Sequence, residues 1–187
     1  GDSWDLGLGA GFYINATQAP WAEHYRMESY IADELYFAVL EHFPIQKGRI
    51  GIMGHSMGGH GALTLAWKYP EKFKSVSAFA PICAPSQCAW GEIAFSHYLG
   101  EAREEWLAHD AVALIQSKGA LFSEVLIDQG LADQFYHQLH PQLLQQACAE
   151  VGQKLTLRQH ESYDHGYYFI QSFIDDHLQF HAAKLTD

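Results

Sequence analysis

Residues 50–63 read IGIMGHSMGGHGAL, an apolar run that leads through a glycine-flanked serine into helix-forming residues. Gly54 and Gly58 lie two residues either side of Ser56, and glycine lets a backbone bend sharply because it has no Cβ to collide. The stretch predicts a short buried strand over 50–53, a tight turn at Ser56, and a helix that continues through 61–69. A G-x-S-x-G motif also occurs by chance in ordinary turns, but the flanking strand and helix favour a nucleophile elbow that exposes the serine hydroxyl.

The elbow predicts both a nucleophile and part of an oxyanion site. Met57 follows the serine at the start of the helix, where its backbone N–H can stabilise a developing negative charge. The Ser56 hydroxyl is a weak nucleophile by itself and needs a base and a group that orients the base. In the α/β-hydrolase arrangement these follow the serine as Asp or Glu and then His, at the ends of later strands. Both are therefore expected downstream of Ser56.

Two aspartates compete for the role of the acid. Residues 124–130 (EVLIDQG) read as a strand that runs into a turn, and Asp133 lies in the loop just after it. Asp133 is favoured because a residue beyond the turn can swing toward the top of the sheet. Asp128, at the end of the strand, is the alternative, and it is expected to accept hydrogen bonds from loop amides instead.

Twelve histidines compete for the role of the base, and only the later ones fit the chain order. Residues 154–159 (KLTLRQ) alternate apolar and polar side chains as a strand does, and the loop that follows carries His165 just before a helix. His165 is the predicted base, and His160, nearer the strand, is the alternative. His177 and His181 lie four residues apart on the last predicted helix and read as surface or packing residues.

The rest of the chain alternates helices and strands, which is typical of an α/β fold with a mostly parallel sheet and helices on both faces. Residues 26–42 carry Met27, Tyr30, Ile31, Leu35 and Val39 at helical spacing, so this helix is expected to pack that face on the sheet. The sequence further predicts a buried strand at 75–82, short helices over 91–110, a helix that begins at Pro141 and ends before Gly152, and a last helix at 167–184. With no repeat or linker in the sequence, residues 1–187 are expected to form one domain.

The aromatic residues around the predicted short helices are expected to have two different roles. Phe95, Tyr98 and Trp106 are expected in a local core, which is the commoner place for aromatic side chains. Trp90 is expected to line the acyl pocket beside Ser56, because it follows the loop after the second strand.

Composition excludes some classes of function. The net charge is −11, with 11 basic and 22 acidic residues, and nucleic-acid binding needs a basic surface that this chain does not provide. No stretch approaches the roughly 20 apolar residues that cross a bilayer. Cys83, Cys88 and Cys148 are odd in number and scattered, which favours reduced thiols and a cytoplasmic protein over a Cys83–Cys88 loop disulfide. The predicted chemistry needs no cofactor or metal.

Several motifs together resemble one known family. The segments GHSMGGHGAL, SVSAFAPIC, IDQGLADQF and YDHGYYFIQSFIDDH, with the opening DLGLGAGFYINATQAPWAEHYRM, are similar to the S-formylglutathione hydrolase (esterase D) family through essentially the whole chain. The resemblance implies a serine thioesterase that hydrolyses S-formylglutathione to glutathione and formate in formaldehyde detoxification. It also implies Ser56 as nucleophile, Asp133 as acid and His165 as base. Other expectations on the same scaffold are a general short-chain carboxylesterase, an acyltransferase, or a truncated inactive relative.

The resemblance also includes one large departure. Members of the family have an N-terminal segment ahead of the position of residue 1, which supplies the first strands of the sheet and the second N–H of the oxyanion hole. Losing one such donor lowers kcat by about 10²–10³-fold. Without those strands, one edge of residues 49–53 is expected to present unpaired amides and carbonyls. We expect a complementing N-terminal segment, a partner chain as in a homodimer, or a rearranged sheet to cover that edge.

Overall fold

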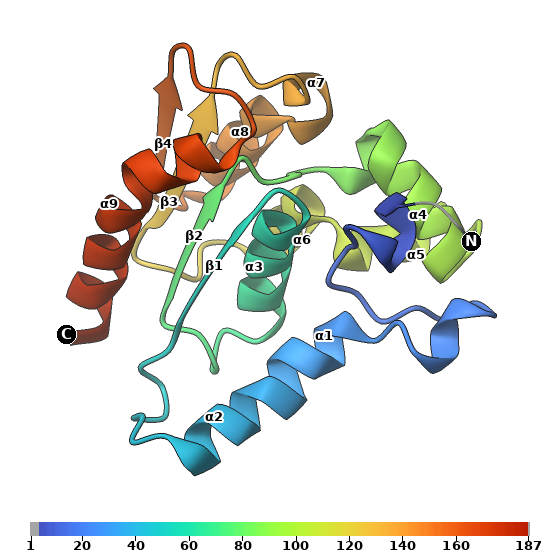
Figure 1. The fold of residues 1–187 in the computed structure, drawn as a ribbon, viewed down its shortest axis with the longest axis horizontal. Helices are drawn as coiled ribbons and strands as arrows, with labels where there is room; N and C mark the ends of the chain where they lie inside the picture. Colours follow the sequence, from blue (N-terminus) through green and yellow to red (C-terminus); the bar gives the residue numbers. More distant parts are fainter. Residues whose placement is uncertain (1–3, 187) are drawn as a thin grey trace.

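The computed structural model describes residues 4–186, in which helices cover both faces of a parallel four-stranded sheet (Figure 1). The strands are β1 (Gly51–His55), β2 (Ser75–Phe79), β3 (Val125–Gly130) and β4 (Leu155–His160), and they lie side by side in that order. Every neighbouring pair is parallel, with Gly51 opposite Ser75 and Val125 opposite both Val76 and Leu155. The predicted α/β-hydrolase class, with a mostly parallel sheet, is confirmed.

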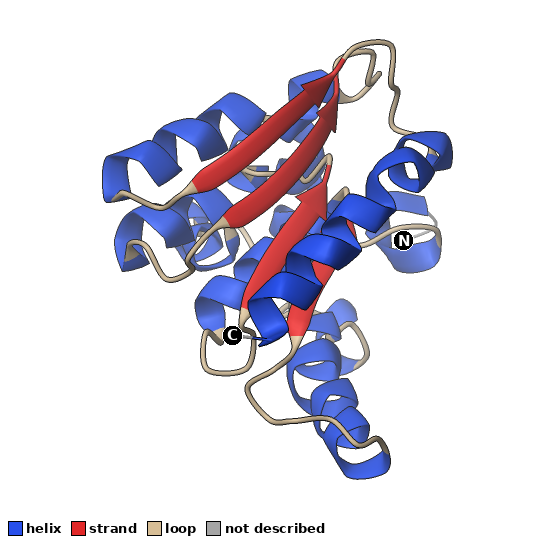
Figure 2. Cartoon of the chain, turned by 90° about the vertical axis from the view of Figure 1, so that its left-hand side faces the viewer, coloured by secondary structure: helices blue, strands red, loops and turns tan. Residues whose placement is uncertain are grey.

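The helices divide between the two faces of the sheet (Figure 2). Their bounds are α1 (Met27–Ser29), α2 (Tyr36–His42), α3 (Met57–Lys68), α4 (Ala89–Leu99), α5 (Arg103–Trp106), α6 (Ala111–Lys118), α7 (Tyr136–Leu139), α8 (Pro141–Val151) and α9 (Tyr167–Thr186). Short 3-10 or π-helical turns occur at Trp4–Leu8, Trp21–Glu23, Tyr30–Leu35, Pro85–Gln87 and Leu107–His109. Helix α9 packs on β2 and β3 from one side, and α3, α6 and α8 form the opposite layer (Figures 1 and 2).

The burial of the strands follows their place in the sheet. Strands β2 and β3 are buried along their whole length because both have strands on either side and helices on both faces. Strand β1 is only half buried, and the Met53 side chain is 40% exposed. Within residues 4–186, β1 has a neighbouring strand on one side only, so the predicted free edge is present.

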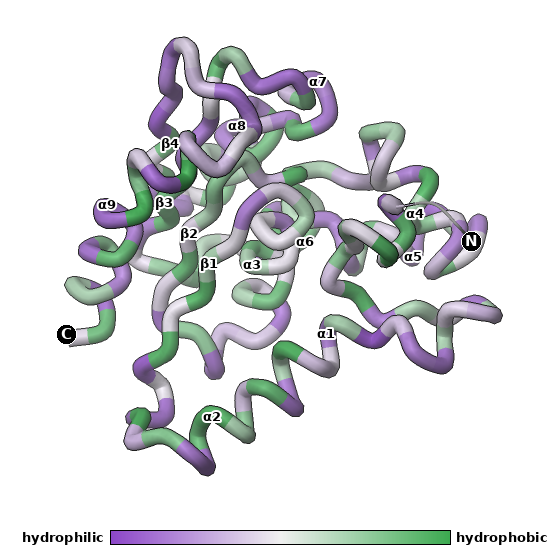
Figure 3. Tube along the Cα trace, viewed as in Figure 1, coloured by the Kyte–Doolittle hydropathy of each residue, from purple (hydrophilic) through white to green (hydrophobic). Residues whose placement is uncertain are grey.

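The helix predicted over 26–42 forms, but its predicted packing face is wrong. It consists of α1, the π-helical stretch Tyr30–Leu35 and α2 in succession, and it projects away from the sheet (Figure 1). Met27, Tyr30 and Leu35 are 37%, 44% and 40% exposed, and the Phe37 side chain of α2 is 55% exposed. Hydrophobic residues, green in Figure 3, continue along α2. The buried side chains are those of Glu28, Ala32 and Tyr36 instead.

Contacts with α3 and the loop after it explain which face of this helix is buried. Ala32 packs in one cluster with Leu65 of α3 and with Phe73, and this cluster reaches the sheet only at Ile52 of β1. The buried carboxylate of Glu28 accepts hydrogen bonds from Lys68 Nζ at 2.6 Å and from the Tyr69 hydroxyl at 2.8 Å. Burial of a carboxylate costs much less free energy when hydrogen-bonding partners compensate for the lost water. The two partners of Glu28 lie about 40 residues away in the sequence.

The aromatic residues of α4 and α5 lie where they were predicted. Phe95, Tyr98 and Trp106 are all buried, and they share a cluster with Phe12 and Ile14 of the N-terminal segment. This cluster fixes the N-terminal segment beside α4. None of the helices in residues 4–186 combines the length and hydrophobicity needed to cross a membrane.

Candidate active site

Ser56 occupies a strained turn between β1 and α3. Its φ of 58° and ψ of −117° are rare for a residue with a side chain, and such strain persists only where the surroundings hold it. The Ser56 N–H donates to the Phe79 carbonyl at 3.0 Å, and its own carbonyl accepts from the N–H groups of His60 at 2.9 Å and Ile82 at 3.3 Å. Gly54 is required because a Cβ at this position would collide with the Gly58 backbone. The turn therefore has the geometry of the predicted elbow.

Met57 is the first residue of α3 and is buried beside the turn. The first N–H groups of a helix have no partner within the helix, and the helix dipole adds partial positive charge there. The Met57 N–H is thus available to an oxyanion formed at Ser56.

Asp133 and His165 are brought together from two loops that are 32 residues apart. Asp133 follows β3 and His165 follows β4, and His165 Nδ1 lies 2.6 Å from Asp133 Oδ2. Since a neutral imidazole that donates from Nδ1 has a free lone pair on Nε2, this contact leaves Nε2 able to act as a base. Across residues 4–186, no hydrogen bond to the Ser56 hydroxyl is present. Such bonds often tighten only when substrate binds.

Asp133 is held as a carboxylate by its partners. Burial by itself would raise the Asp133 pKa, but the hydrogen bonds from His165 and from the Phe135 N–H outweigh it and hold the pKa below its usual value. The Phe135 N–H donates to Oδ1 at 2.8 Å, and Gln129 Nε2 donates to Oδ2 at 3.2 Å. The Asp133 carboxylate, which accepts the hydrogen bond from His165, is therefore charged and held in one orientation.

Ser56 and His165 line one cavity of about 680 Å³. Trp90 also lines it, as predicted from its place after β2, and its ring centroid lies 4.6 Å from that of Phe135. The Phe135 ring in turn meets the His165 ring edge to face, with centroids 5.2 Å apart. The cavity extends past these aromatic side chains to Met53 on the free side of β1, and it is larger than a formyl group requires. The catalytic and pocket roles of these residues remain predictions.

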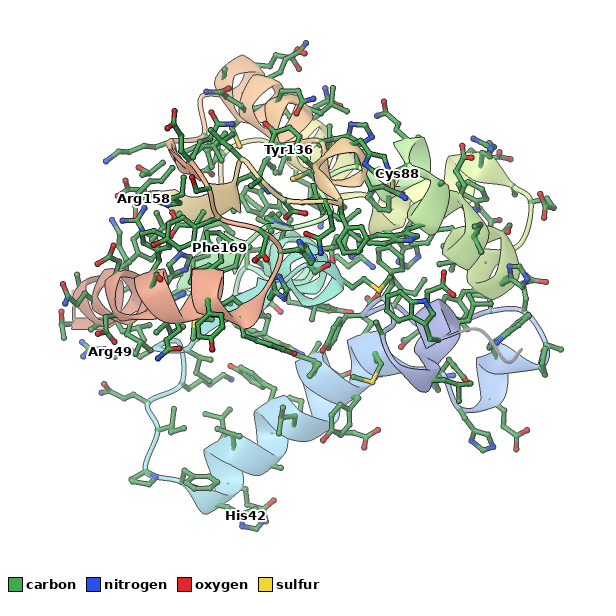
Figure 4. All side chains as sticks on the ribbon, turned by 45° about the horizontal axis from the view of Figure 1, so that its top comes forward. His42, Arg49, Cys88, Tyr136, Arg158 and Phe169 are labelled. Carbon is green, nitrogen blue, oxygen red and sulfur yellow. The ribbon has the colours of Figure 1, made fainter. Side chains whose placement is uncertain are left out.

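The alternative acid, Asp128, belongs to a separate buried network. Arg158 Nη2 and Nε donate to its two oxygens at 2.5 and 2.6 Å, and His160 and His177 each lie 3.1 Å from it. Burial would raise the Asp128 pKa, but these side-chain hydrogen bonds lower it to about 2. The expectation that Asp128 bonds to loop amides is wrong, because its side-chain partners are these three side chains. Arg158 lies beside α9 (Figure 4).

His177 and His181 are buried rather than superficial. His177 Nδ1 lies 2.8 Å from the Ser77 hydroxyl, and the His181 nitrogens lie 2.8 Å from Ser77 Oγ and 2.6 Å from Ser75 Oγ. The His177 ring also stacks on Phe79 at 3.8 Å. Of the two predicted roles, surface or packing, the packing role is confirmed and the surface role is wrong, because two serines of β2 contact these histidines where α9 packs on the sheet. Helical spacing alone does not reveal such partners.

Three residues of the site were not predicted. Gln129 and Phe135 bind Asp133 from positions four residues before it and two residues after it, and an Asp that accepts from an N–H two residues on is a common turn signal. His55 lines the cavity and contacts His165, and its place beside the serine was a signal that could have been used. In the described part of the chain, no group of three or more His, Cys, Asp or Glu side chains is arranged to hold a metal ion.

Comparisons with known proteins agree with this geometry. The model of the Esterase family matches residues 1–180. The structure of an S-formylglutathione hydrolase from Agrobacterium tumefaciens is 52% identical, with a TM-score of 0.94 over 98% of this chain and 66% of that chain. The fluorophosphonate-binding serine hydrolase F from Staphylococcus aureus is 20% identical, with a TM-score of 0.71 over 90% of this chain and 66% of that chain.

An S-formylglutathione hydrolase from Staphylococcus aureus is also similar, at 20% identity and a TM-score of 0.67, over 89% of this chain and 66% of that chain. At 20% identity, the two staphylococcal structures show a shared fold alone. The present chain spans 66% of the length of each of these three proteins.

Proposed function

This chain belongs to the esterase family, and we propose that it is a serine thioesterase that hydrolyses S-formylglutathione to glutathione and formate. The proposal rests chiefly on one observation. His165 Nδ1 lies 2.6 Å from the buried Asp133 carboxylate, in a cavity that His165 shares with Ser56 at a strand-to-helix elbow. The 52% identity to an S-formylglutathione hydrolase supports the choice of substrate.

The first half of the proposed reaction transfers the formyl group to Ser56. His165 Nε2 takes the proton of the Ser56 hydroxyl as Oγ attacks the thioester carbonyl, while Asp133 stabilises the imidazolium. The Met57 N–H donates to the oxyanion of the tetrahedral intermediate. The carbon–sulfur bond then breaks, and glutathione leaves as the thiol with the proton from His165.

The second half releases formate. Water loses a proton to His165 Nε2 and attacks the carbonyl of the formyl-serine, which gives a second oxyanion at the same position. The bond to Ser56 Oγ breaks, and His165 returns the proton to that oxygen. The enzyme regains its starting protonation, the released formic acid ionises to formate in solution, and no cofactor is consumed.

A complete oxyanion hole needs a second donor besides the Met57 N–H. We propose that a complementing segment, equivalent to part of the relatives' chain beyond the 66% that is matched, or a second copy of this chain supplies it. The same element would cover the free edge of β1, which borders the cavity at Met53.

A general short-chain carboxylesterase is the second candidate. The match to the Esterase family model supports it, because the description of that family as an esterase specifies no acyl group. Free Cys83, Cys88 and Cys148, all buried, support the further proposal that the protein works in the reducing cytoplasm.

Competition among substrates tests the proposal. The values of kcat/KM for S-formylglutathione, S-acetylglutathione and p-nitrophenyl esters of increasing chain length are measured, with Ser56→Ala as the control. We expect S-formylglutathione to be preferred and Ser56→Ala to abolish turnover of every substrate. A preference for longer oxygen esters would establish the carboxylesterase instead, and equal rates in the wild type and Ser56→Ala would exclude both enzymes.

A further inference from the structure

His55 connects the strand that carries the nucleophile to the loop that carries the predicted base. It is the last residue of β1, and Ser56 follows it directly. Its ring centroid lies 4.4 Å from that of His165, with the two planes inclined by 41°, and 6.4 Å from that of Tyr167. The same cavity is lined by His55, Ser56, His165 and Tyr167.

One ring nitrogen of His55 does not contribute to stability. Its Nε2 is buried and has no hydrogen-bond partner. A buried nitrogen without a partner lowers stability, and such groups in folded proteins call for an explanation. The contact with His165 offers one, because the His55 ring lies against the His165 ring there.

The ring of His55 is uncharged at neutral pH. Burial, followed by the proximity of His165, lowers its pKa to about 4, although the Asp133 charge and a backbone hydrogen bond at His165 act in the opposite direction. An uncharged ring can stay in contact with His165 without repelling the imidazolium that forms when Ser56 loses its proton.

The bond to Asp133 alone does not orient the His165 ring. A hydrogen bond at Nδ1 fixes one atom and leaves the ring free to tilt about it, so that Nε2 can turn away from Ser56. A contact on the ring removes that freedom, and Phe135 provides a second one at 87°. We infer that His55 is a positioning residue whose ring supports the His165 imidazole and limits its tilt, so that Nε2 can serve Ser56 in the cavity that they share. This inference rests on the proposed role of His165 as the base.

Three variants of this chain test the inference. His55→Ala removes the ring, His55→Phe keeps a flat uncharged ring, and His42→Ala removes an exposed histidine at the far end of α2 (Figure 4). We expect His55→Ala to lower kcat for S-formylglutathione by about 10- to 100-fold, because small misplacements of a catalytic group cost rate on this scale. KM should change little, His55→Phe should recover most of the lost kcat, and His42→Ala should match the wild type.

Two further measurements test the role of His55 whether or not S-formylglutathione is the substrate. One is the rate at which a fluorophosphonate labels Ser56, and the other is the downfield proton resonance of the Asp133–His165 hydrogen bond. His55→Ala should slow the labelling and broaden the resonance, and His55→Phe should restore both. If the wild type is labelled but does not hydrolyse S-formylglutathione, the proposed function fails while these readouts still decide the role of His55.

Several results would overturn the inference. Unchanged kcat, labelling and resonance in His55→Ala would show that the ring contact has no role. A rise in KM with unchanged kcat would make His55 a substrate contact instead. Failure of a folded His55→Phe to recover activity would show that the shape of the ring is not what matters.

Discussion

The Asp133→Asn substitution exchanges one carboxylate oxygen for an NH₂ group at a position where both oxygens accept hydrogen bonds. Oδ2 lies 2.6 Å from His165 Nδ1 and 3.2 Å from Gln129 Nε2, and Oδ1 lies 2.8 Å from the Phe135 nitrogen. The new NH₂ must therefore face a donor whichever way the amide turns. A backbone N–H cannot become an acceptor, but a neutral imidazole can, by moving its proton from Nδ1 to Nε2.

The side facing His165 is therefore the favoured place for the NH₂ group. Gln129 assists, since its Oε1 is buried without a partner and can accept from the new NH₂ once the Gln129 amide turns over. His165 Nδ1 then accepts a hydrogen bond, and Nε2 carries the proton and can no longer take one from Ser56. Replacement of the acid in a Ser-His-Asp triad by Asn lowers kcat by about 10⁴-fold for this reason. We expect a loss of about 10³–10⁴-fold, or roughly 4–5.5 kcal/mol of activation free energy.

The assay compares kcat for S-formylglutathione with the rate of Ser56 labelling by a fluorophosphonate. Asp128→Asn is the matched control, because it makes the same change at a buried aspartate that contacts Arg158 and two other histidines. It should lower stability and leave kcat within a few-fold of the wild type. A kcat of Asp133→Asn within about tenfold of the wild type would show that the Asp133 carboxylate does not set the His165 tautomer. A greater loss of activity in the folded Asp128→Asn variant than in Asp133→Asn would show that Asp133 is not the acid of the site.

Three further predictions concern the elbow, the pocket and the buried network. Gly54→Ala should destabilise the fold by about 1–3 kcal/mol, because the new Cβ meets the Gly58 backbone, which cannot rotate away; an unchanged thermal midpoint would contradict this. Trp90→Ala should raise kcat/KM for butyryl relative to formyl thioesters by about tenfold, because it opens the pocket wall; an unchanged ratio would exclude Trp90 from that wall. The pKa of Asp128 is about 2 in the folded chain and about 3.8 unfolded, so its ionised form stabilises the fold above pH 4. About 2 kcal/mol should be lost between pH 4 and pH 2 in urea unfolding, and Asp128→Asn should lack this loss.

Local sequence signals predicted the parts of the site that depend on local structure. The glycines around Ser56 are needed for the turn itself, and the position of Asp133 beyond the end of β3 follows from the same strand pattern that the structure contains. The preference for His165 over His160 rested on loop position. It agrees with the contacts, since His165 meets Asp133 while His160 meets Asp128 and stacks on Phe173.

Features that depend on partners far away in the sequence were not predicted. Glu28 is buried because Lys68 and Tyr69 reach it from α3 and its C-terminal end, which shifts the buried face of the helix at 26–42. His177 is buried because Ser77 and Asp128 meet it from the face of the sheet on which α9 packs. Hydrophobic periodicity records which residues lie on one side of an element, but not which polar groups meet them there.

Formate release from S-formylglutathione tests the central claim most directly. The purified chain and its Ser56→Ala variant are compared under identical conditions, with folding checked by circular dichroism and the mass in solution recorded for both. We expect formate and glutathione to appear in equal amounts with the wild type and turnover to be lost in Ser56→Ala. Equal background rates from two folded samples would contradict it and would leave this chain as a scaffold that keeps the geometry of a triad without its activity.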